Sequence, residues 1–197
     1  MDRTKITSIS SLLCKFYTRC FSYPYDEMNY ELHHIFRLLE QNNISEDDYQ
    51  QIEQVLSIIN QYQGEDIKDI RDDYVLIFTG DENRKPLCPM LASEFLQNFG
   101  KHYDMFSFSD FIFDSGIPIN PGEDVDSIIN FLEYFSILLE QTSQGDLEES
   151  FLKEYIDNHI INWIPYFCDV LYKAASMSFY REIAIGLKGF LLWLSED

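Results

Sequence analysis

The sequence has few basic residues and no long apolar run. Its 197 residues include 34 Asp and Glu against 14 Lys and Arg, a formal net charge of −20. Because nucleic-acid binding depends on Lys and Arg that neutralise phosphates, this balance argues against a nucleic-acid partner. The longest apolar stretches, 128–139 and 184–194, contain polar or charged residues and fall short of the roughly 18 residues of a membrane span. The N-terminus lacks a signal-peptide pattern, so we expect a soluble, cytoplasmic protein.

The sequence also lacks the common catalytic and ligand motifs. It contains no phosphate-binding G-x-x-x-x-G-K-[ST] or G-x-G-x-x-G and no G-x-S-x-G nucleophile turn. Glu31 and His34 form one Glu-x-x-His pair, but a di-iron site in a helix bundle needs two such pairs and two further Glu. We therefore predict no catalytic residue, no metal and no cofactor. Free, buried thiols are expected of the four cysteines, which form neither a C-x-x-C pair nor a zinc spacing: Cys14, Cys20, Cys88 and Cys168.

Apolar residues recur every three or four positions along most of the chain, which is the spacing of amphipathic α-helices. Segment 101–115 is ambiguous because its aromatic residues alternate, but Asp110 at its centre and its helical neighbours favour a helix. Ser45 and Ser178 are expected to cap the helices that follow them. The predicted helices cover about residues 6–22, 27–41, 45–64, 66–79, 90–99, 101–115, 126–139, 147–156, 165–174 and 178–194.

A break in regular structure lies near the middle of the chain. Two glycines and two prolines fall within residues 116–122, and no helix or strand continues through that spacing. The helix after the break is apolar on more than one face and should be buried. Acidic residues are expected in its first turn, where free N–H groups favour negative charge: Glu123, Asp124 and Asp126.

The predicted fold is therefore all-α. We expect a single helical domain over residues 1–197, with about ten helices in two sub-bundles joined by a Pro/Gly hinge near 116–123. A hinge of this kind permits either a closed monomer or exchange of the C-terminal half between two chains, because the same interface serves both. A monomer with a minor, domain-swapped dimer is the expected state.

Several short motifs follow one another in a recognisable order. Asp73-Tyr74…Phe78-Thr79-Gly80 is similar to the pattern E-Y-x-x-L-F-x-G, and Pro86-Leu87-Cys88-Pro89 is similar to a proline-rich loop that follows it. An F-L…H-L…W-x-P-x-F pattern is matched by Phe151, Leu152, His159, Trp163, Pro165 and Phe167. An F-Y-x-x-L-A…F-L helix is matched by Phe179, Tyr180, Ala184, Phe190 and Leu191. In this order, over about residues 66–194, the chain resembles the TorD/DmsD family of cytoplasmic molybdoenzyme chaperones, with which NarJ-type chaperones are grouped.

The resemblance implies a non-catalytic maturation chaperone. Such a protein binds the N-terminal segment of a molybdopterin oxidoreductase subunit, often a twin-arginine (Tat) signal peptide. It delays export of the subunit until the molybdenum cofactor is inserted. Two alternatives stay open at this point. One is a helical enzyme that binds a small molecule or nucleotide, and the other is a structural assembly subunit of a redox complex.

The resemblance places peptide recognition at the proline-rich loop and the central break. Family members carry E-x-D-H-I at the break, and its last three residues fall on Asp126-Ser127-Ile128, so Ser127 replaces the histidine. A second alignment places them on Glu123-Asp124-Val125, again without histidine. The implied polar part of the site comprises Glu123, Asp124, Asp126 and Ser127. The implied apolar wall comprises Tyr74, Phe78, Pro86, Pro89 and Met90, of which Met90 stands where relatives often carry an aromatic residue. Core packing is the competing interpretation of the aromatic residues.

Overall fold

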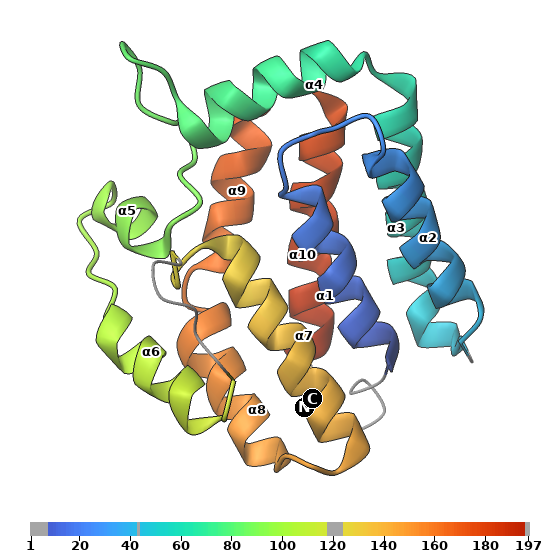
Figure 1. The fold of residues 1–197 in the computed structure, drawn as a ribbon, viewed down its shortest axis with the longest axis vertical. Helices are drawn as coiled ribbons and strands as arrows, with labels where there is room; N and C mark the ends of the chain where they lie inside the picture. The colour runs from blue at the N-terminus through green and yellow to red at the C-terminus, as the bar shows by residue number, and fades with distance from the viewer. Residues whose placement is uncertain (1–7, 43, 118–123, 196–197) are drawn as a thin grey trace.

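The computed structural model describes residues 8–42, 44–117 and 124–195, and within them the chain is all-α, as predicted (Figure 1). Short 3-10 and π segments extend three of the helices: η2 (Glu46–Asp48), η3 (Val75–Thr79) and η4 (Ile156–Ile160). The ten α-helices of the described residues are α1 (Ser8–Cys20), α2 (Met28–Glu40), α3 (Tyr49–Gly64), α4 (Ile67–Tyr74), α5 (Ala92–Gln97), α6 (Met105–Asp114), α7 (Ile128–Gln144), α8 (Glu149–Tyr155), α9 (Ile164–Ala174) and α10 (Ser178–Ser195).

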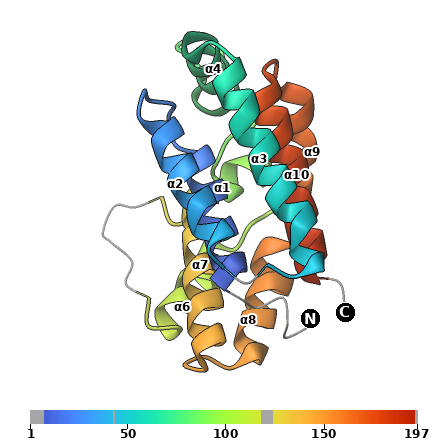
Figure 2. The ribbon, with the colours of Figure 1, turned by 90° about the vertical axis from the view of Figure 1, so that its right-hand side faces the viewer.

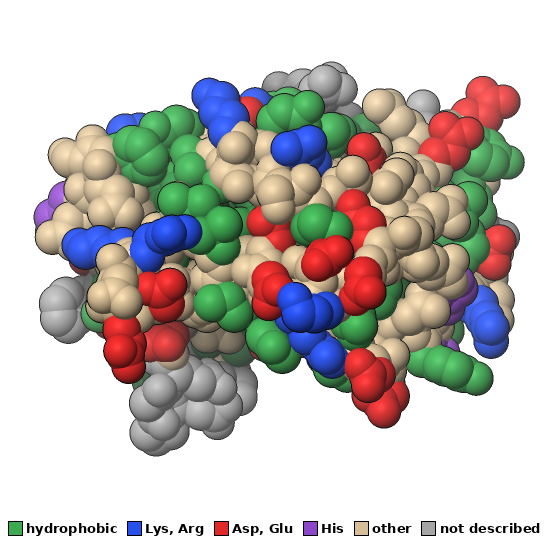
Figure 3. Space-filling model, turned by 90° about the horizontal axis from the view of Figure 1, so that it is seen from above, with side chains coloured by type: hydrophobic (Ala, Val, Ile, Leu, Met, Phe, Trp, Pro, Cys, Tyr) green, Lys and Arg blue, Asp and Glu red, His purple; other side chains and the backbone are tan. Residues whose placement is uncertain are grey.

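Helices from the two halves of the chain interleave. The N-terminal helix α1 packs along α7, and α10 packs against both α3 and α9 (Figures 1 and 2). Helix α4 crosses one end of this bundle, and acidic, basic and apolar side chains are interspersed on that end of the surface (Figure 3). The halves therefore share one core, while the predicted hinge at Pro118, Pro121 and Gly122 lies outside the described residues.

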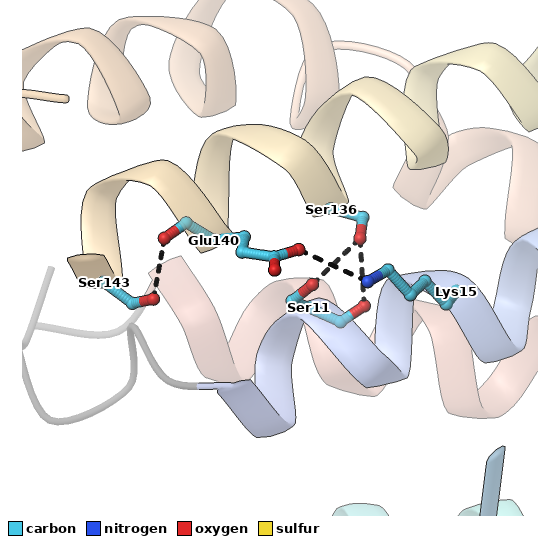
Figure 4. Close-up of polar contacts among 5 residues, drawn as sticks. All are labelled: Ser11, Lys15, Ser136, Glu140 and Ser143. Carbon is cyan, nitrogen blue, oxygen red and sulfur yellow. Dashed lines mark hydrogen bonds and ion pairs between the residues drawn. The ribbon is translucent and has the colours of Figure 1, made fainter. Parts of the chain in front are cut away.

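The contact between α1 and α7 is close because small side chains meet there. Ser11 and Ser136 are buried, and their hydroxyl oxygens lie 2.9 Å apart (Figure 4). The Ser136 hydroxyl also lies 3.2 Å from the backbone oxygen of Ser11, to which it donates. Nearer the surface, Lys15 Nζ lies 3.3 Å from a carboxylate oxygen of Glu140. This pairing joins a helix of the first half of the chain to one of the second half.

Local signals define most of the helix ends. Ser45 is the N-cap of η2, where its N–H donates to Asp48 Oδ2 at 2.8 Å in a capping box, so the predicted cap is confirmed. Pro165 lies in the first turn of α9, where its missing N–H costs no hydrogen bond. Gly145 adopts a left-handed conformation, with φ of 83°, directly after α7. These residues act on their own segments, so the sequence predicts many helix ends to within a few residues. Helix α7 is an exception, because it ends at Gln144, five residues beyond the predicted end at 139.

The start of α10 is capped from distant segments, unlike the predicted cap at Ser178. Ser178 is the first residue of the helix, and its N–H donates to Glu65 Oε1 at 2.7 Å. The buried carboxylate of Asp73 accepts hydrogen bonds from the Ser176 N–H, the Ser176 hydroxyl and the Met177 N–H. Two carboxylates therefore bind the free N–H groups at this helix start and tie it to α3 and α4.

The start of α7 differs from the prediction. The helix begins at Ile128, and the Ser127 side chain accepts a hydrogen bond from the Asn130 N–H at 3.2 Å. The acidic residues expected in the first turn therefore precede the helix, and Glu123 lies outside the described residues. Ser127 takes the N-cap position because its short hydroxyl reaches the free N–H groups of the first turn.

Candidate functional site

The structure joins the proline-rich loop to the segment that precedes α7. The Ala92 N–H donates to the Asp126 backbone oxygen, and the Ile128 N–H donates to the Met90 backbone oxygen, both at 2.8 Å. These bonds flank an isolated antiparallel bridge between Leu91 and Ser127. Two segments that the resemblance assigned separately to recognition thus form one unit, held by main-chain hydrogen bonds. We call this unit the loop–joint site; its backbone consists of residues 86–91 and 124–128.

Asp126 has a structural partner inside this unit. Its side chain is 4% exposed, and its Oδ2 accepts a hydrogen bond from the Ser93 N–H at 2.8 Å. Because Ser93 is the second residue of α5, Asp126 caps that helix across the bridge. Burial raises the pKa of the Tyr103 phenol, and the nearby charge of Asp126 raises it further. The carboxylate that faces solvent in this unit belongs to Asp124.

The segment that carries Asp124 is fixed by its neighbours. The Ser127 N–H donates to the Asp124 backbone oxygen at 2.9 Å, and the Asn130 side-chain amide donates to the same oxygen at 2.9 Å. The backbone at Asp124 is therefore held while its side chain stays exposed. An exposed carboxylate on a fixed backbone can meet a cationic group with little loss of conformational entropy.

The proline-rich loop is anchored to the π segment η3. The Cys88 N–H donates to the Ile77 backbone oxygen at 2.8 Å, and the buried Cys88 thiol contacts the Phe167 backbone oxygen at 3.8 Å. Pro89 is buried, while Pro86 and Met90 are half-buried. Leu87 is 46% exposed. The loop therefore presents three apolar side chains, of which Leu87 was not predicted, although its place between two prolines was visible in the sequence.

Tyr74 and Phe78 belong to the core behind this loop. They are 6% and 5% exposed, and their ring centroids lie 5.1 Å apart. Tyr180 of α10 packs against Phe78 at 5.5 Å, and burial raises the pKa of Tyr74 to about 12. Both side chains contribute to packing, as the competing interpretation stated, and they support the loop from beneath. Nearby, Tyr23 contacts Tyr74 at 5.3 Å and is half exposed, so it extends the aromatic cluster to the surface.

A second buried polar group lies under α6. His159 is in the π segment η4, is 7% exposed, and has the rings of Phe108 and Phe111 each at 5.1 Å. Burial lowers the pKa of His159 to about 4, so the imidazole is neutral near pH 7. Its backbone oxygen accepts a hydrogen bond from the Trp163 indole at 2.9 Å. The motif His159…Trp163 thus builds core structure.

The described residues contain no cluster of three or more His, Cys, Asp or Glu arranged to hold a metal ion. Their four cysteines are free and buried, and burial raises the pKa of each thiol, which makes these thiols poor nucleophiles. In the same residues, no helix combines the length and apolar character that crossing a membrane requires.

A family model described as the nitrate reductase delta subunit matches residues 41–169, which is more than half of the chain. The chain belongs to this family. The match extends from the segment before α3 into α9 and includes the whole loop–joint site. The NarJ-type members of the family are non-catalytic chaperones for redox-enzyme maturation, and membership implies binding to a molybdoenzyme subunit. The resemblance seen in the sequence is thereby confirmed.

The fold also occurs in a solved structure. A protein from Archaeoglobus fulgidus, provisionally described as a redox enzyme maturation protein, superposes with a TM-score of 0.58 at 19% sequence identity. The superposition covers 92% of this chain and 93% of that one. A search of the curated proteins finds no significant match. At this identity the structural likeness shows the fold, and the assignment to a family rests on the family model.

Proposed function

We propose that this protein is a cytoplasmic maturation chaperone that binds the N-terminal segment of a molybdopterin oxidoreductase subunit. It holds this segment, often a twin-arginine signal peptide, until the molybdenum cofactor is inserted. The observation that carries the proposal is the main-chain bridge between the proline-rich loop and the segment before α7. This bridge sets exposed apolar side chains of the loop in the same unit as an exposed carboxylate.

The chemistry of this site suits such a peptide. An amphipathic leader can place apolar side chains against Pro86, Leu87 and Met90, which are all partly or fully accessible. An arginine of the peptide can pair with the Asp124 carboxylate, since Arg favours carboxylate partners. Asp126 contributes indirectly on this view, because its carboxylate binds the Ser93 N–H and thereby holds the loop in place. Ser127 likewise fixes the start of α7.

Calorimetry with the leader peptide of a co-encoded molybdopterin oxidoreductase subunit tests the proposal. We expect binding at micromolar strength or better, which corresponds to about −8 kcal/mol. Leu87→Ala and Asp124→Asn should each weaken binding, the latter by about fivefold, as for an exposed ion pair worth roughly 1 kcal/mol. Asp146→Asn is the matched control, because Asp146 is also exposed but follows the C-terminal end of α7.

Three outcomes would count against this function. One is the absence of binding to the leader of every co-encoded oxidoreductase subunit. Another is an equal loss of affinity in Asp124→Asn and Asp146→Asn, which would show that only net charge matters. The third is stoichiometric retention of this chain in the purified, cofactor-loaded enzyme, which would identify a structural assembly subunit instead of a chaperone.

A further inference from the structure

A groove of about 950 Å³ lies between α1 and α2, which pack side by side (Figures 1 and 2). Its lining extends from Leu12 to Arg19 on α1 and from Asn29 to Leu38 on α2. Gln63 of α3 and Glu133 of α7 complete the lining. None of these residues belongs to the loop–joint site. The volume lies at the upper end of the range, about 300–1,000 Å³, that is typical of binding pockets.

The groove has apolar surface along a length that suits a helix. Leu12, Ile35 and Leu38 are half-buried, and Tyr30 is 82% exposed. Eight residues of α2 from Asn29 to Leu38 line the groove, and this stretch spans about 14 Å at 1.5 Å per residue. That length is between two and three turns of a partner helix, enough for apolar side chains at i, i+3, i+4 and i+7.

The charge of the groove is opposite to that of the molecule. Three of the chain's 14 Lys and Arg line the groove against two acidic residues, whereas the whole chain carries −20. Two of the four histidines, His33 and His34, line it as well. Lys15 and Arg19 lie one turn apart on α1, and Arg37 lies on α2. Both walls therefore carry cationic groups, which favours an occupant with acidic residues on both edges of its apolar stripe.

The existing ion pairs leave these cations available. Lys15 and Glu140 are both half exposed, and Arg19 lies 2.8 Å from Glu31 with both side chains 41% exposed. Exposed pairs of this kind contribute only about 0–1 kcal/mol, so a partner carboxylate can exchange with them. Arg37 is exposed and forms no ion pair with another described residue. The cationic groups of the lining outnumber its carboxylates, so the groove favours an acidic occupant over a twin-arginine peptide.

We propose that the groove lined by Lys15, Arg19 and Arg37 docks an amphipathic helix of a partner protein whose apolar stripe is flanked by acidic residues. This surface is additional to the loop–joint site, and its partner is recognised by the opposite charge. A chaperone with both surfaces can hold a basic leader segment and an acidic helix at the same time.

Two designed helical peptides test this assignment. Both carry leucines at i, i+3, i+4 and i+7; one has glutamates on both edges of that stripe, and the other has lysines at the same positions. Fluorescence anisotropy should show the glutamate peptide binding about tenfold tighter at low salt, with the difference shrinking as salt rises. Non-specific attraction to a chain of net charge −20 would favour the lysine peptide, so this order of affinities is diagnostic.

Variants locate the binding and separate it from the proposed function. Arg37→Glu should weaken the glutamate peptide about tenfold, whereas Lys173→Glu, which makes the same charge change at an exposed position on α9, should leave its affinity unchanged. Leader-peptide binding should be the same in both variants. Simultaneous binding of the glutamate peptide and the leader would support two separate surfaces, even if the leader binds elsewhere than proposed.

Several results would overturn the assignment. These are tighter binding of the lysine peptide, binding of neither peptide, equal losses in Arg37→Glu and Lys173→Glu, or competition between the glutamate peptide and the leader. Binding of inorganic tripolyphosphate in place of the glutamate peptide, with the same dependence on Arg37, would assign the groove to small anions. A dimer of the wild type that Arg37→Glu converts to monomer would assign it to a second copy of the chain.

Discussion

Protonation of His159 should destabilise the protein in mild acid. The imidazole is buried against Phe108, Phe111 and Tyr155, and burial lowers its pKa from the ordinary value of 6.5 to about 4. The unfolded chain therefore binds a proton at a higher pH than the folded chain does. Stability that is present above pH 6.5 is lost as the pH falls towards 4, because the unfolded state then gains the proton first.

The size of this effect follows from the two pKa values. A difference of about 2.5 units at 1.36 kcal/mol per unit gives roughly 3 kcal/mol when the loss is complete. At pH 5.5 the unfolded imidazole is mostly protonated and the folded one is not, so about 1.4 kcal/mol should already be lost. Since native proteins are stable by only about 5–15 kcal/mol, a change of this size is readily measured.

Urea unfolding at several pH values between 7 and 5 measures the effect. Trp163 is 1% exposed and its indole donates to the His159 backbone oxygen, so its fluorescence reports on the unfolding of this region. His159→Gln should be less stable at pH 7 but should lack the loss of free energy between pH 7 and 5. His102→Gln is the matched control, because His102 is exposed and its replacement should preserve the wild-type slope.

The difference between variants isolates the imidazole from the 34 acidic residues, because every variant contains the same acidic residues. Far-UV circular dichroism should give the same transition as fluorescence, as a two-state treatment requires. If His159→Gln loses stability with falling pH as steeply as the wild type does, then burial of this histidine does not produce the pH dependence, and the reasoning is refuted.

Three further predictions concern the caps and turns around the site. Asp73→Ala should lower the free energy of unfolding in urea by about 2–3 kcal/mol, since it leaves the N–H groups before α10 without their acceptor. Asp72→Ala, at the exposed neighbour, should change it by less than about 0.5 kcal/mol. Equal effects would show that the capping carboxylate does not produce the loss. Asp126→Ala should cost about 1 kcal/mol through the lost α5 cap, and unchanged leader affinity in the folded variant would remove this residue from the peptide site. Gly80→Ala should cost more than Gly100→Ala in thermal unfolding. Both positions have positive φ, but an added Cβ at Gly80 would clash with the Arg84 backbone oxygen, whereas one at Gly100 meets nothing within 4 Å. Equal costs would mean that the loop adjusts freely.

The sequence predicted part of the candidate site. The resemblance assigned the proline-rich loop and the central break each to peptide recognition, and the structure joins them through the bridge between Leu91 and Ser127. The resemblance did not distinguish side chains that face solvent from those that support the loop. Tyr74 and Phe78 follow helical spacing, and that spacing shows only that a side chain lies on an apolar face. Whether such a face meets another helix or a ligand depends on the rest of the fold.

The sequence by itself determined the all-α class, nearly every helix and the turns that end them. These features depend on residues within one segment, such as the Ser45 cap, Pro165 at the start of α9 and Gly145 after α7, and short-range hydrogen bonds and dihedral preferences suffice to produce them. The ambiguous segment 101–115 contains a helix, as its polar centre Asp110 favoured, but this helix covers only Met105–Asp114.

The tertiary structure decided which residues serve elements far away in the chain. Asp126 caps α5 instead of α7, and Asp73 holds a helix start that lies about a hundred positions later in the chain. His159 is neutral because α6 covers it, and the basic groove exists because α1 and α2 lie side by side. A sequence pattern specifies which face of a helix is apolar, but hydrophobic burial is non-directional and does not select the partner of that face. The partner is fixed only when the helices pack. The same holds for every cap or charge cluster that forms between helices.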